Sequence, residues 1–187
     1  MEIWDVYDDQ RRPTGRTHIR GRLMAGGENH IAVGIIVFNR KGEILLTRRC
    51  PEKRIAPGQW ENTVGSVLAG EDSLSGAVRE LREETGIEAE EDELFFLHTV
   101  NRRIPHCFMD VYLLYRDIDL SQLVLQPGET CEARWVRFRQ WESMLQQEHM
   151  SVVCTDDRGV FLDQVRRYMS YCIHSIRRKE RERRVHK

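Results

Sequence analysis

The first half of the chain alternates between apolar runs that predict β-strands and short polar turns. Residues 30–39 (HIAVGIIVFN) are rich in β-branched side chains, and residues 43–49 (EILLTRR) form a second run after the turn sequence RKG. Two such runs joined by a tight turn are typical of a β-hairpin. Shorter runs at 2–7 and 60–67 predict two further strands, whereas residues 8–15 (DDQRRPTG) have the composition of a turn.

The second half contains three more apolar runs and two helical patterns. Residues 93–100, 106–116 and 132–138 predict strands, and residues 139–147 and 157–184 predict helices. With the central helix described next, the chain runs through strands, one helix, more strands and then helices. This order predicts an α/β or α+β fold in which a mixed sheet is sandwiched between helices.

The central helix is predicted between residues 72 and 86. Asp72 and Ser73 favour a helix N-terminus, and Gly86 favours its end. Between them, four apolar residues recur at positions i, i+3, i+4 and i+7: Leu74, Ala77, Val78 and Leu81. This spacing turns one apolar stripe toward a core.

Three glutamates share another face of this helix. At about 100° per residue, Glu80, Glu83 and Glu84 lie across a face that is separate from the apolar stripe. Arg79 precedes Glu83 by four residues and borders it. Like charges at this spacing cost roughly a few tenths of a kcal/mol. A solvated acidic surface is one interpretation, and a hard divalent cation that binds several carboxylates is the other.

The segment that begins at Gly65 resembles the complete signature of the Nudix hydrolases, G-x5-E-x7-R-E-U-x-E-E-x-G-U, where U is a bulky aliphatic residue. All nine defined positions agree: Gly65, Glu71, Arg79, Glu80, Leu81, Glu83, Glu84, Gly86 and Ile87. A match of this length favours the metal-binding interpretation. The resemblance implies a Nudix-type mixed sheet between helices, in which the signature forms a loop, a helix and a loop.

The resemblance also implies roles for the matching residues. Glu80, Glu83 and Glu84 would bind or organise Mg²⁺ or Mn²⁺, together with the carbonyl oxygen of Gly65. Arg79 would position a glutamate and would not touch the substrate.

The implied reaction is hydrolysis of a diphosphate bond in a small molecule, for instance a nucleoside diphosphate linked to another group. Cations on the phosphate oxygens would favour attack on phosphorus by a water whose proton a carboxylate takes. In this family the base lies within the signature, where Glu83 is the candidate, or in a later loop. There we favour Glu129, since it follows a Pro-Gly turn, over Glu132, which begins a strand. Glu71 would assist near the metals or stabilise its loop.

Residues 30–64 resemble another branch of the same superfamily, the isopentenyl-diphosphate isomerases. The shared features are a His before the first core strand, LLTRR, a later Lys, and P-G-x-W-x-N. That branch requires a catalytic cysteine and a metal-binding histidine just after W-x-N, where this chain has Gly65 and Val67. We therefore favour hydrolysis, with isomerisation or non-catalytic nucleotide binding as alternatives. Residues 2–145 also resemble an uncharacterised bacterial group of Nudix hydrolases.

Side chains outside the signature are weaker candidates. Four cations flank the loop after the second core strand and either reach phosphates or remain surface charges: Arg48, Arg49, Lys53 and Arg54. His30 is expected to be structural, because its partner position in the isomerase pattern holds Val67. Trp60 and Phe108 are expected to pack in the core.

Length and charge complete the outline. The 187 residues are most simply one Nudix domain, with a strand-and-turn extension over about 1–28 and a basic helix or tail over about 157–187. The net charge of −1 gives no general bias toward nucleic acid. Residues 177–187 carry seven Lys/Arg and two Glu, a balance of +5 that leaves −6 for the rest. We interpret this run as a solvated helix end, the alternative being a tail that binds nucleic acid or a partner.

The cysteines and termini indicate the compartment. Five scattered cysteines predict reduced thiols and a cytoplasmic protein. The N-terminus lacks the apolar core of a signal peptide, and no apolar run is long enough to suggest a membrane partner. The N-terminal strand and the long C-terminal helix are candidate contact elements of a homodimer.

Overall fold

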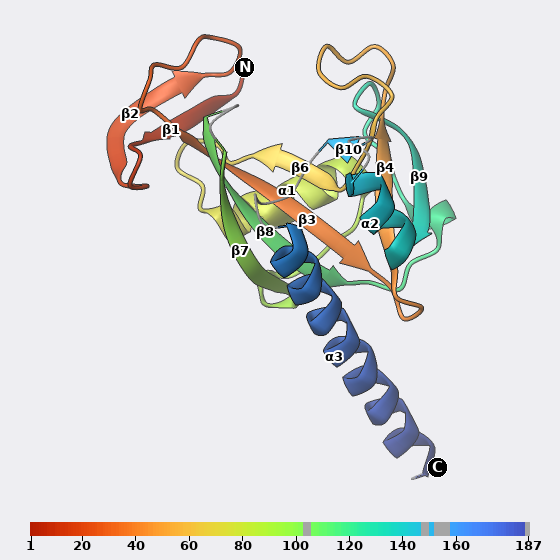
Figure 1. The fold of residues 1–187 in the computed structure, drawn as a ribbon. Coiled ribbons are helices and arrows are strands. Elements are labelled where there is room, and N and C mark those ends of the chain that lie inside the picture. The colour runs from red at the N-terminus through yellow and green to blue at the C-terminus, as the bar shows by residue number, and fades with distance from the viewer. Residues whose placement is uncertain (103–105, 147–149, 152–157, 186–187) are drawn as a thin grey trace.

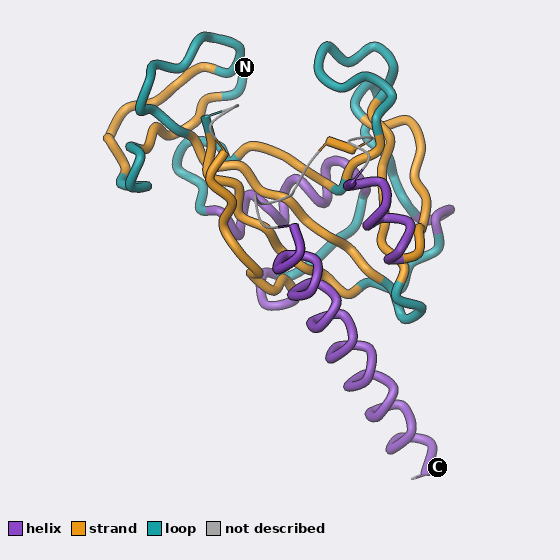
Figure 2. The backbone as a smooth tube through the Cα atoms, in the orientation of Figure 1, coloured by secondary structure: helices purple, strands orange, loops and turns teal. Residues whose placement is uncertain are grey.

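The computed structural model describes residues 1–102, 106–146, 150–151 and 158–185. A mixed sheet forms its centre, and helices cover both faces of this sheet (Figure 1). An N-terminal hairpin forms a separate two-stranded sheet, and the C-terminal helix extends away from the central sheet (Figure 2). The predicted fold class is confirmed.

The elements follow one another in the predicted order of strands, helix, strands and helices. The strands are β1 (Ile3–Tyr7), β2 (Pro13–Ile19), β3 (His30–Phe38), β4 (Glu43–Arg49), β5 (Trp60–Glu61), β6 (Thr63–Ser66), β7 (Leu94–Arg102), β8 (Cys107–Tyr115), β9 (Thr130–Arg137) and β10 (Met150–Ser151). The α-helices are α1 (Ser73–Thr85), α2 (Phe138–Gln146) and α3 (Arg158–Val185), and short 3₁₀ turns occupy Glu91–Glu93 and Leu120–Gln122.

Strands β3 and β4 diverge soon after the turn that joins them. Their register pairs Phe38 with Ile44, next to the turn. Farther along, β3 pairs with β6 and, in parallel, with β8, whereas β4 pairs with β5 and β9. The sheet is therefore splayed, and β6, which leads into the signature, lies directly beside β3.

Alternate side chains of β3 supply two cores, one on each face of the sheet. Ile31, Val33 and Ile35 pack on the α1 side, where they meet Ala77 and Leu81. The opposite core joins the other β3 side chains to α2 and α3: Ala32, Ile36, Phe38, Trp141, Leu145, Phe161, Leu162, Val165 and Met169. Each fully buried large side chain contributes about 1.5–3 kcal/mol, so α1 is held firmly against the sheet.

The predicted single strand over 60–67 is wrong, because the chain changes partners at Asn62. The side chain of Asn62 is fully buried. Its amide nitrogen donates to the carbonyl of Leu45 at 3.4 Å, and its oxygen accepts from the indole N–H of Trp141 at 3.1 Å. These bonds fix the chain at the point where its pairing partner changes from β4 to β3. The segment is therefore divided into two strands, β5 and β6.

The N-terminal extension contains a strand that the sequence did not predict. Part of the segment interpreted as a turn belongs to β2, which pairs with β1 in an antiparallel hairpin. Pro13 and Gly15 explain why this strand was not predicted, because both residues are disfavoured in strands. The hairpin contacts the signature: the N–H of Ala69 donates to the carbonyl of Ile3, and the N–H of Gly70 donates to the carboxylate of Asp5, both at 2.8 Å.

Helix α3 packs on the sheet with its first half and leaves it with its second (Figure 1). The side chains of residues 177–183 are exposed, as predicted for a solvated helix end. Residues 147, 157 and 186–187, at the ends of predicted elements, lie outside the described residues. Within the described ranges, no helix is long and apolar enough to cross a membrane.

The end of α1 generates a stability prediction. Gly86 has a φ of +71°, and a Cβ there would lie 2.8 Å from the Cβ of Val124. Gly86→Ala therefore adds a steric clash to left-handed backbone strain, and we expect the free energy of unfolding in urea to fall by about 2–4 kcal/mol.

Gly15→Ala is the matched control. Gly15 has a φ of +73°, and no atom of the described residues lies within 4 Å of a Cβ there. We expect only the strain of about 1–2 kcal/mol. Equal losses at the two positions would contradict a clash with Val124.

Candidate functional site

Helix α1 carries the signature glutamates, and its two ends fix their direction. The carboxylate of Asp72 caps the helix by accepting from the N–H groups of Leu74 and Ser75, each at 2.9 Å. Gly86 ends it in the left-handed conformation. The predicted N-cap and stop are therefore confirmed. With its apolar stripe packed on the sheet, α1 turns its glutamates toward the loops that precede and follow it.

Arg79 is the centre of the carboxylate cluster. Its guanidinium makes two parallel hydrogen bonds to Glu71, from Nε at 2.7 Å and from Nη2 at 2.9 Å. Nη1 donates to Glu80 at 2.8 Å and to Glu83 at 3.3 Å. Nη2 also reaches the backbone carbonyl of Ser66 at 2.9 Å. One cation therefore ties the loop before α1 to two of the helix glutamates.

The environment shifts these groups in different directions. The hydrogen bonds from Arg79 lower the pKa of Glu71, and Glu71 in turn raises the pKa of Arg79. Burial raises the pKa of Glu80 despite its contact with Arg79. Glu71 is thus stabilised as an anion that also accepts from the N–H of Leu68 at 3.0 Å, whereas Glu80 is a partly buried acid that Arg79 neutralises incompletely.

Gly65 makes room for Glu80. A Cβ at position 65 would lie 1.9 Å from the carboxyl carbon of Glu80, far inside van der Waals contact. The Glu80 carboxylate therefore packs directly against the Gly65 backbone. This contact brings the two signature residues together, although 15 positions separate them in the sequence.

Glu84 is the most deeply buried of the signature carboxylates. It is 8% exposed, and its Oε2 has no hydrogen-bond partner among the described residues. Burial raises its pKa well above the usual value, and the charges of Glu61 and Glu80 raise it further. Thr63 supplies a side-chain hydrogen bond that opposes this shift. An acid of this kind favours a cationic partner beyond those the chain supplies.

A divalent cation fits the chemistry of these groups. Carboxylate and carbonyl oxygens are the ligands that Mg²⁺ and Mn²⁺ prefer, and Glu84 presents such an oxygen without a partner. Within the described residues, no three or more His, Cys, Asp or Glu side chains are already gathered closely enough to hold an ion. Arg79 holds Glu80 and Glu83 instead, so these two side chains would have to turn from Arg79 to bind one.

The loop that carries Glu129 is fixed to the end of α1. The N–H of Val124 donates to the carbonyl of Thr85 at 2.9 Å, and the N–H of Gln126 donates to the carbonyl of Glu84 at 3.3 Å. The N–H of Glu129 closes the loop onto the carbonyl of Gln126 at 3.2 Å. The structure therefore places the Glu129 loop beside α1, and its 41% exposed side chain forms an ion pair with Lys53.

Comparison with known proteins identifies the family. A family model described as the NUDIX domain matches residues 28–155. The chain belongs to the Nudix family. An uncharacterized Nudix hydrolase of Listeria monocytogenes is 36% identical over 149 residues, which cover 77% of this chain and 85% of that protein.

Two further similarities are to an isomerase sequence and to a solved structure of the same fold. An isopentenyl-diphosphate Delta-isomerase of Paenarthrobacter aurescens is 35% identical over 104 residues, covering 55% of this chain and 56% of the isomerase. A crystal structure of a Deinococcus radiodurans protein has a TM-score of 0.65 at 20% identity, covering 87% of this chain and 98% of that one. The predicted resemblances to both branches are confirmed, and the chain is a Nudix hydrolase, of a family that acts on small molecules.

Most of the predicted loop cations are already paired with acids, and Arg54 is exposed. The ion pairs join Arg48 to Glu132 at 3.2 Å, Arg49 to Glu61 at 2.9 Å, and Lys53 to Glu129. A phosphate that reached this loop would compete with these carboxylates. Glu132 lies in β9, opposite Arg48, whereas Glu129 belongs to the loop that is hydrogen-bonded to the end of α1.

The predicted structural histidine is buried. His30 is within 3.0 Å of the carbonyl oxygen of His106 through Nδ1, and the ring of Trp4 stacks on it at a centroid distance of 4.1 Å. Burial lowers the pKa of His30 to about 4. Phe108 is buried in the sheet, and Trp60 packs partly against the core, as expected for both aromatic residues.

Glu61 is the residue that the sequence analysis missed. Its side chain is buried in the Nudix core, where its charge raises the pKa of Glu84. The alternation of side chains across a strand gives a signal for it, because Glu61 and Thr63 flank Asn62, which points to the opposite face. The charge of Glu61, however, made an exposed position the natural expectation.

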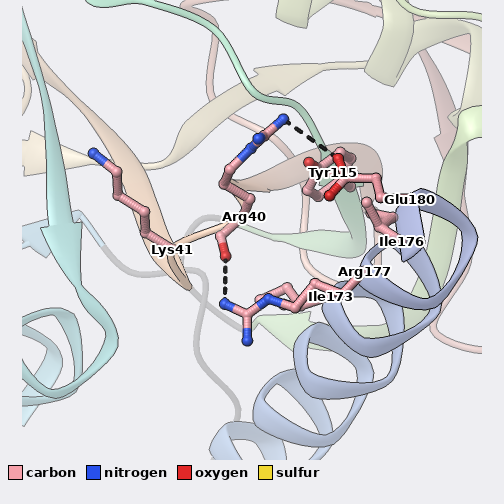
Figure 3. A pocket seen from close by; sticks show the side chains of 7 residues that line it. All are labelled: Arg40, Lys41, Tyr115, Ile173, Ile176, Arg177 and Glu180. Atoms are coloured by element: carbon pink, nitrogen blue, oxygen red, sulfur yellow. Dashed lines mark hydrogen bonds and ion pairs between the residues drawn. The ribbon is translucent and has the colours of Figure 1, made fainter. Parts of the chain in front are cut away.

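Two cavities in the described part of the chain lie away from the signature. One of about 400 Å³ opens near the start of β3 and is lined by Asp9, Gly27, Asn29, Asn101 and His106. The other, of about 290 Å³, lies between the β3–β4 turn and α3 (Figure 3) and is lined by Arg40, Lys41, Tyr115, Ile173, Ile176, Arg177 and Glu180. No signature residue lines either of these two cavities.

The contact between Gly65 and Glu80 generates the second prediction. Gly65→Ala would drive the Glu80 carboxylate from its position, because the new methyl group overlaps it. Displacement of a catalytic group by about 1 Å costs about 100-fold in rate, and we expect at least this loss of kcat/KM in the hydrolase. Gly26→Ala, where a Cβ meets no described atom within 4 Å, is the control. Wild-type activity in Gly65→Ala would rule out a role for the displaced carboxylate.

Proposed function

We propose that this Nudix hydrolase uses Mg²⁺ or Mn²⁺ to cleave a diphosphate bond in a small molecule, for instance a nucleoside diphosphate linked to another group. The proposal rests on one observation: the buried Oε2 of Glu84 has no hydrogen-bond partner among the described residues. The neighbouring Glu80 carboxylate packs against Gly65, which has no side chain. A buried acid with a strongly raised pKa at the end of a complete Nudix signature favours binding of a cation.

Glu80, Glu83, Glu84 and the Gly65 carbonyl would hold the cation. When bound, such an ion neutralises phosphate oxygens and lowers the pKa of a coordinated water. Glu83 is the most exposed of the three glutamates, with 42% of its side chain accessible. It is therefore the signature carboxylate best placed to meet a substrate.

Arg79 acts as a positioning residue in this proposal. Its paired hydrogen bonds to Glu71 and its bond to the Ser66 carbonyl anchor the guanidinium to the loop. Glu80 and Glu83 each accept a single hydrogen bond from it. These two glutamates can therefore turn toward a cation while Glu71 and Arg79 keep the loop and the helix together.

Glu129 is the base that we favour. It is half-exposed, close in the chain to the Gln126 N–H that bonds the end of α1, and able to accept the proton of an attacking water. Its partner Lys53 would leave the ion pair to meet the substrate phosphate. Glu83 is the alternative base within the signature.

Isomerisation of isopentenyl diphosphate is the second candidate, because isomerases of the same superfamily are similar in sequence. The residues that this reaction needs are absent from their expected places. Gly65 has no side chain, and the buried Val67 stands where the isomerase pattern has a histidine. His30 packs against Trp4 and turns Nδ1 to a backbone carbonyl. Hydrolysis is therefore the better-supported reaction.

Location and assembly are further parts of the proposal. Three cysteines in the described chain are free thiols, which supports a cytoplasmic protein: Cys50, Cys131 and Cys172. A homodimer in which the N-terminal hairpin or α3 makes the contact stays a prediction. For the basic end of α3 we favour a solvated surface over nucleic-acid binding, because Glu180 and Glu182 interrupt its arginines.

A hydrolysis panel tests the reaction. With Mg²⁺ or Mn²⁺ at mildly alkaline pH, we expect cleavage of at least one compound among nucleoside triphosphates, ADP-ribose, sugar nucleotides and dinucleotides, with products resolved by mass. Loss of one charge-stabilising group costs about 10²–10³-fold in kcat. We therefore expect at least this loss in Glu83→Gln and Glu84→Gln, and none in the exposed Glu132→Gln.

Two results of this panel would contradict the proposal. Full activity in the presence of a chelator would exclude a cation. Isomerised isopentenyl diphosphate, detected in the same panel, would show that the reaction is proton transfer.

A comparison of Glu129→Gln with Glu83→Gln identifies the base. Removal of a general base lowers kcat by about 10²–10⁴-fold, and we expect this loss in Glu129→Gln with unchanged Mn²⁺ affinity. Glu83→Gln is expected to weaken Mn²⁺ binding as well. If Glu129→Gln retains its kcat while Glu83→Gln loses activity without weaker Mn²⁺ binding, the base lies in the signature.

A further inference from the structure

A buried ion pair lies next to the candidate metal site. Nη1 of Arg49 donates to Oε1 of Glu61 at 2.9 Å, and the Glu61 side chain is only 4% exposed. Arg49 ends β4 and Glu61 ends β5, which is paired with β4. Neither residue belongs to the Nudix signature, and both lie on the strand side of the site, opposite α1.

The strand pattern explains why Glu61 points toward α1. The Asn62 side chain lies on the other face, where its oxygen accepts a hydrogen bond from the indole N–H of Trp141. Its neighbours Glu61 and Thr63 therefore turn to the α1 face. Thr63 makes a side-chain hydrogen bond to Glu84, and the charge of Glu61 acts on the same carboxyl group. The ion pair and the Glu84 carboxylate thus share one buried polar region.

The acids in this region lie between two arginines. Arg79 is bonded to Glu80 on one side, and Arg49 is bonded to Glu61 on the other. Glu84 lies within electrostatic reach of both acids and of Arg49. Its Oε2 nevertheless has no partner among the described residues. Glu80 and Glu61 are thus each bonded to an arginine, whereas Oε2 of Glu84 is available to an external cation.

Arg49 would neutralise Glu84 if it were free to move. It is held by two acceptors: Glu61, and the carbonyl of Ile55, which accepts from Nε at 2.9 Å. Removal of the Glu61 charge would leave the partly buried Arg49 guanidinium without a carboxylate, with Glu84 as the nearby acid. A buried charge without a partner is strongly unfavourable, so Arg49 would turn to Glu84 and cover the oxygen that a metal ion needs.

We propose that Glu61 is a positioning residue that holds Arg49 away from Glu84 and so keeps the Glu84 carboxylate open for a divalent cation. This inference rests on the proposed function, because it concerns the same cation. It assigns to β5 and β4 a part in metal binding that lies outside the signature helix. Arg49 contacts neither substrate nor metal in this scheme and acts only as the competing cation.

A double-mutant cycle on Mn²⁺ binding tests the proposal, with the dissociation constant measured by electron paramagnetic resonance on the full chain. We expect Glu61→Gln to weaken binding by about 10–100-fold, as observed when partners behind metal ligands are removed. Arg49→Met removes the competing cation and should bind Mn²⁺ at least as tightly as the wild type. The double variant should recover most of the lost affinity.

A second ion pair that also involves β4 provides the control. Arg48 and Glu132 form an exposed ion pair across β4 and β9, and Arg48→Met, Glu132→Gln and their double variant should leave Mn²⁺ affinity unchanged. Thermal unfolding with and without Mn²⁺ gives a second measurement. A merely structural Glu61 would lower the transition temperature of Glu61→Gln equally in both conditions, whereas we expect the shift produced by Mn²⁺ to shrink.

Each remaining outcome decides against the inference. Wild-type Mn²⁺ affinity in Glu61→Gln would overturn it, as would a double variant no better than Glu61→Gln. If Glu61→Gln does not fold, weaker binding by Arg49→Met than by the wild type overturns it instead. Absence of Mn²⁺ binding by the wild type itself would remove the proposed function, and this inference with it.

Discussion

The desolvation of carboxylates placed between α1 and the sheet is the constraint around which this part of the molecule is arranged. Glu80 and Glu84 lie in surroundings that raise the pKa of each, so both are costly to ionise. The chain offsets part of this cost with Arg79 at one side and Arg49 at the other. The compensation is incomplete at Glu84, and the proposed cation would supply the missing positive charge.

The rest of the fold keeps that cluster in place. Two hydrophobic cores hold α1 on one face of the sheet and α2 and α3 on the opposite face. The burial of these apolar side chains offsets the free energy that the buried charges cost. The divergence of β3 and β4 matters as well. It lets β6 lie beside β3 and β5 beside β4, so that Gly65 and Glu61 reach the same helix from two parts of the sheet.

Local sequence patterns were sufficient to predict the elements whose structure depends on residues close together in the chain. The caps at Asp72 and Gly86, the apolar stripe of α1 and most core strands follow from spacing within a few residues. The Nudix signature identified the cluster for the same reason. Long-range packing decides the rest: Asn62 breaks a strand through its bond to Trp141, and Arg49 and Glu61 meet only when β4 and β5 pair. No short window of sequence contains those contacts.

The contact between Gly65 and Glu80 also bears on how one fold supports two chemistries. In this chain a side chain at position 65 and the Glu80 carboxylate in its observed position would occupy the same volume. In the isomerase pattern a cysteine stands at position 65. A substitution that adds a side chain at position 65 would therefore also require another position for the Glu80 carboxylate, so the two positions are sterically coupled.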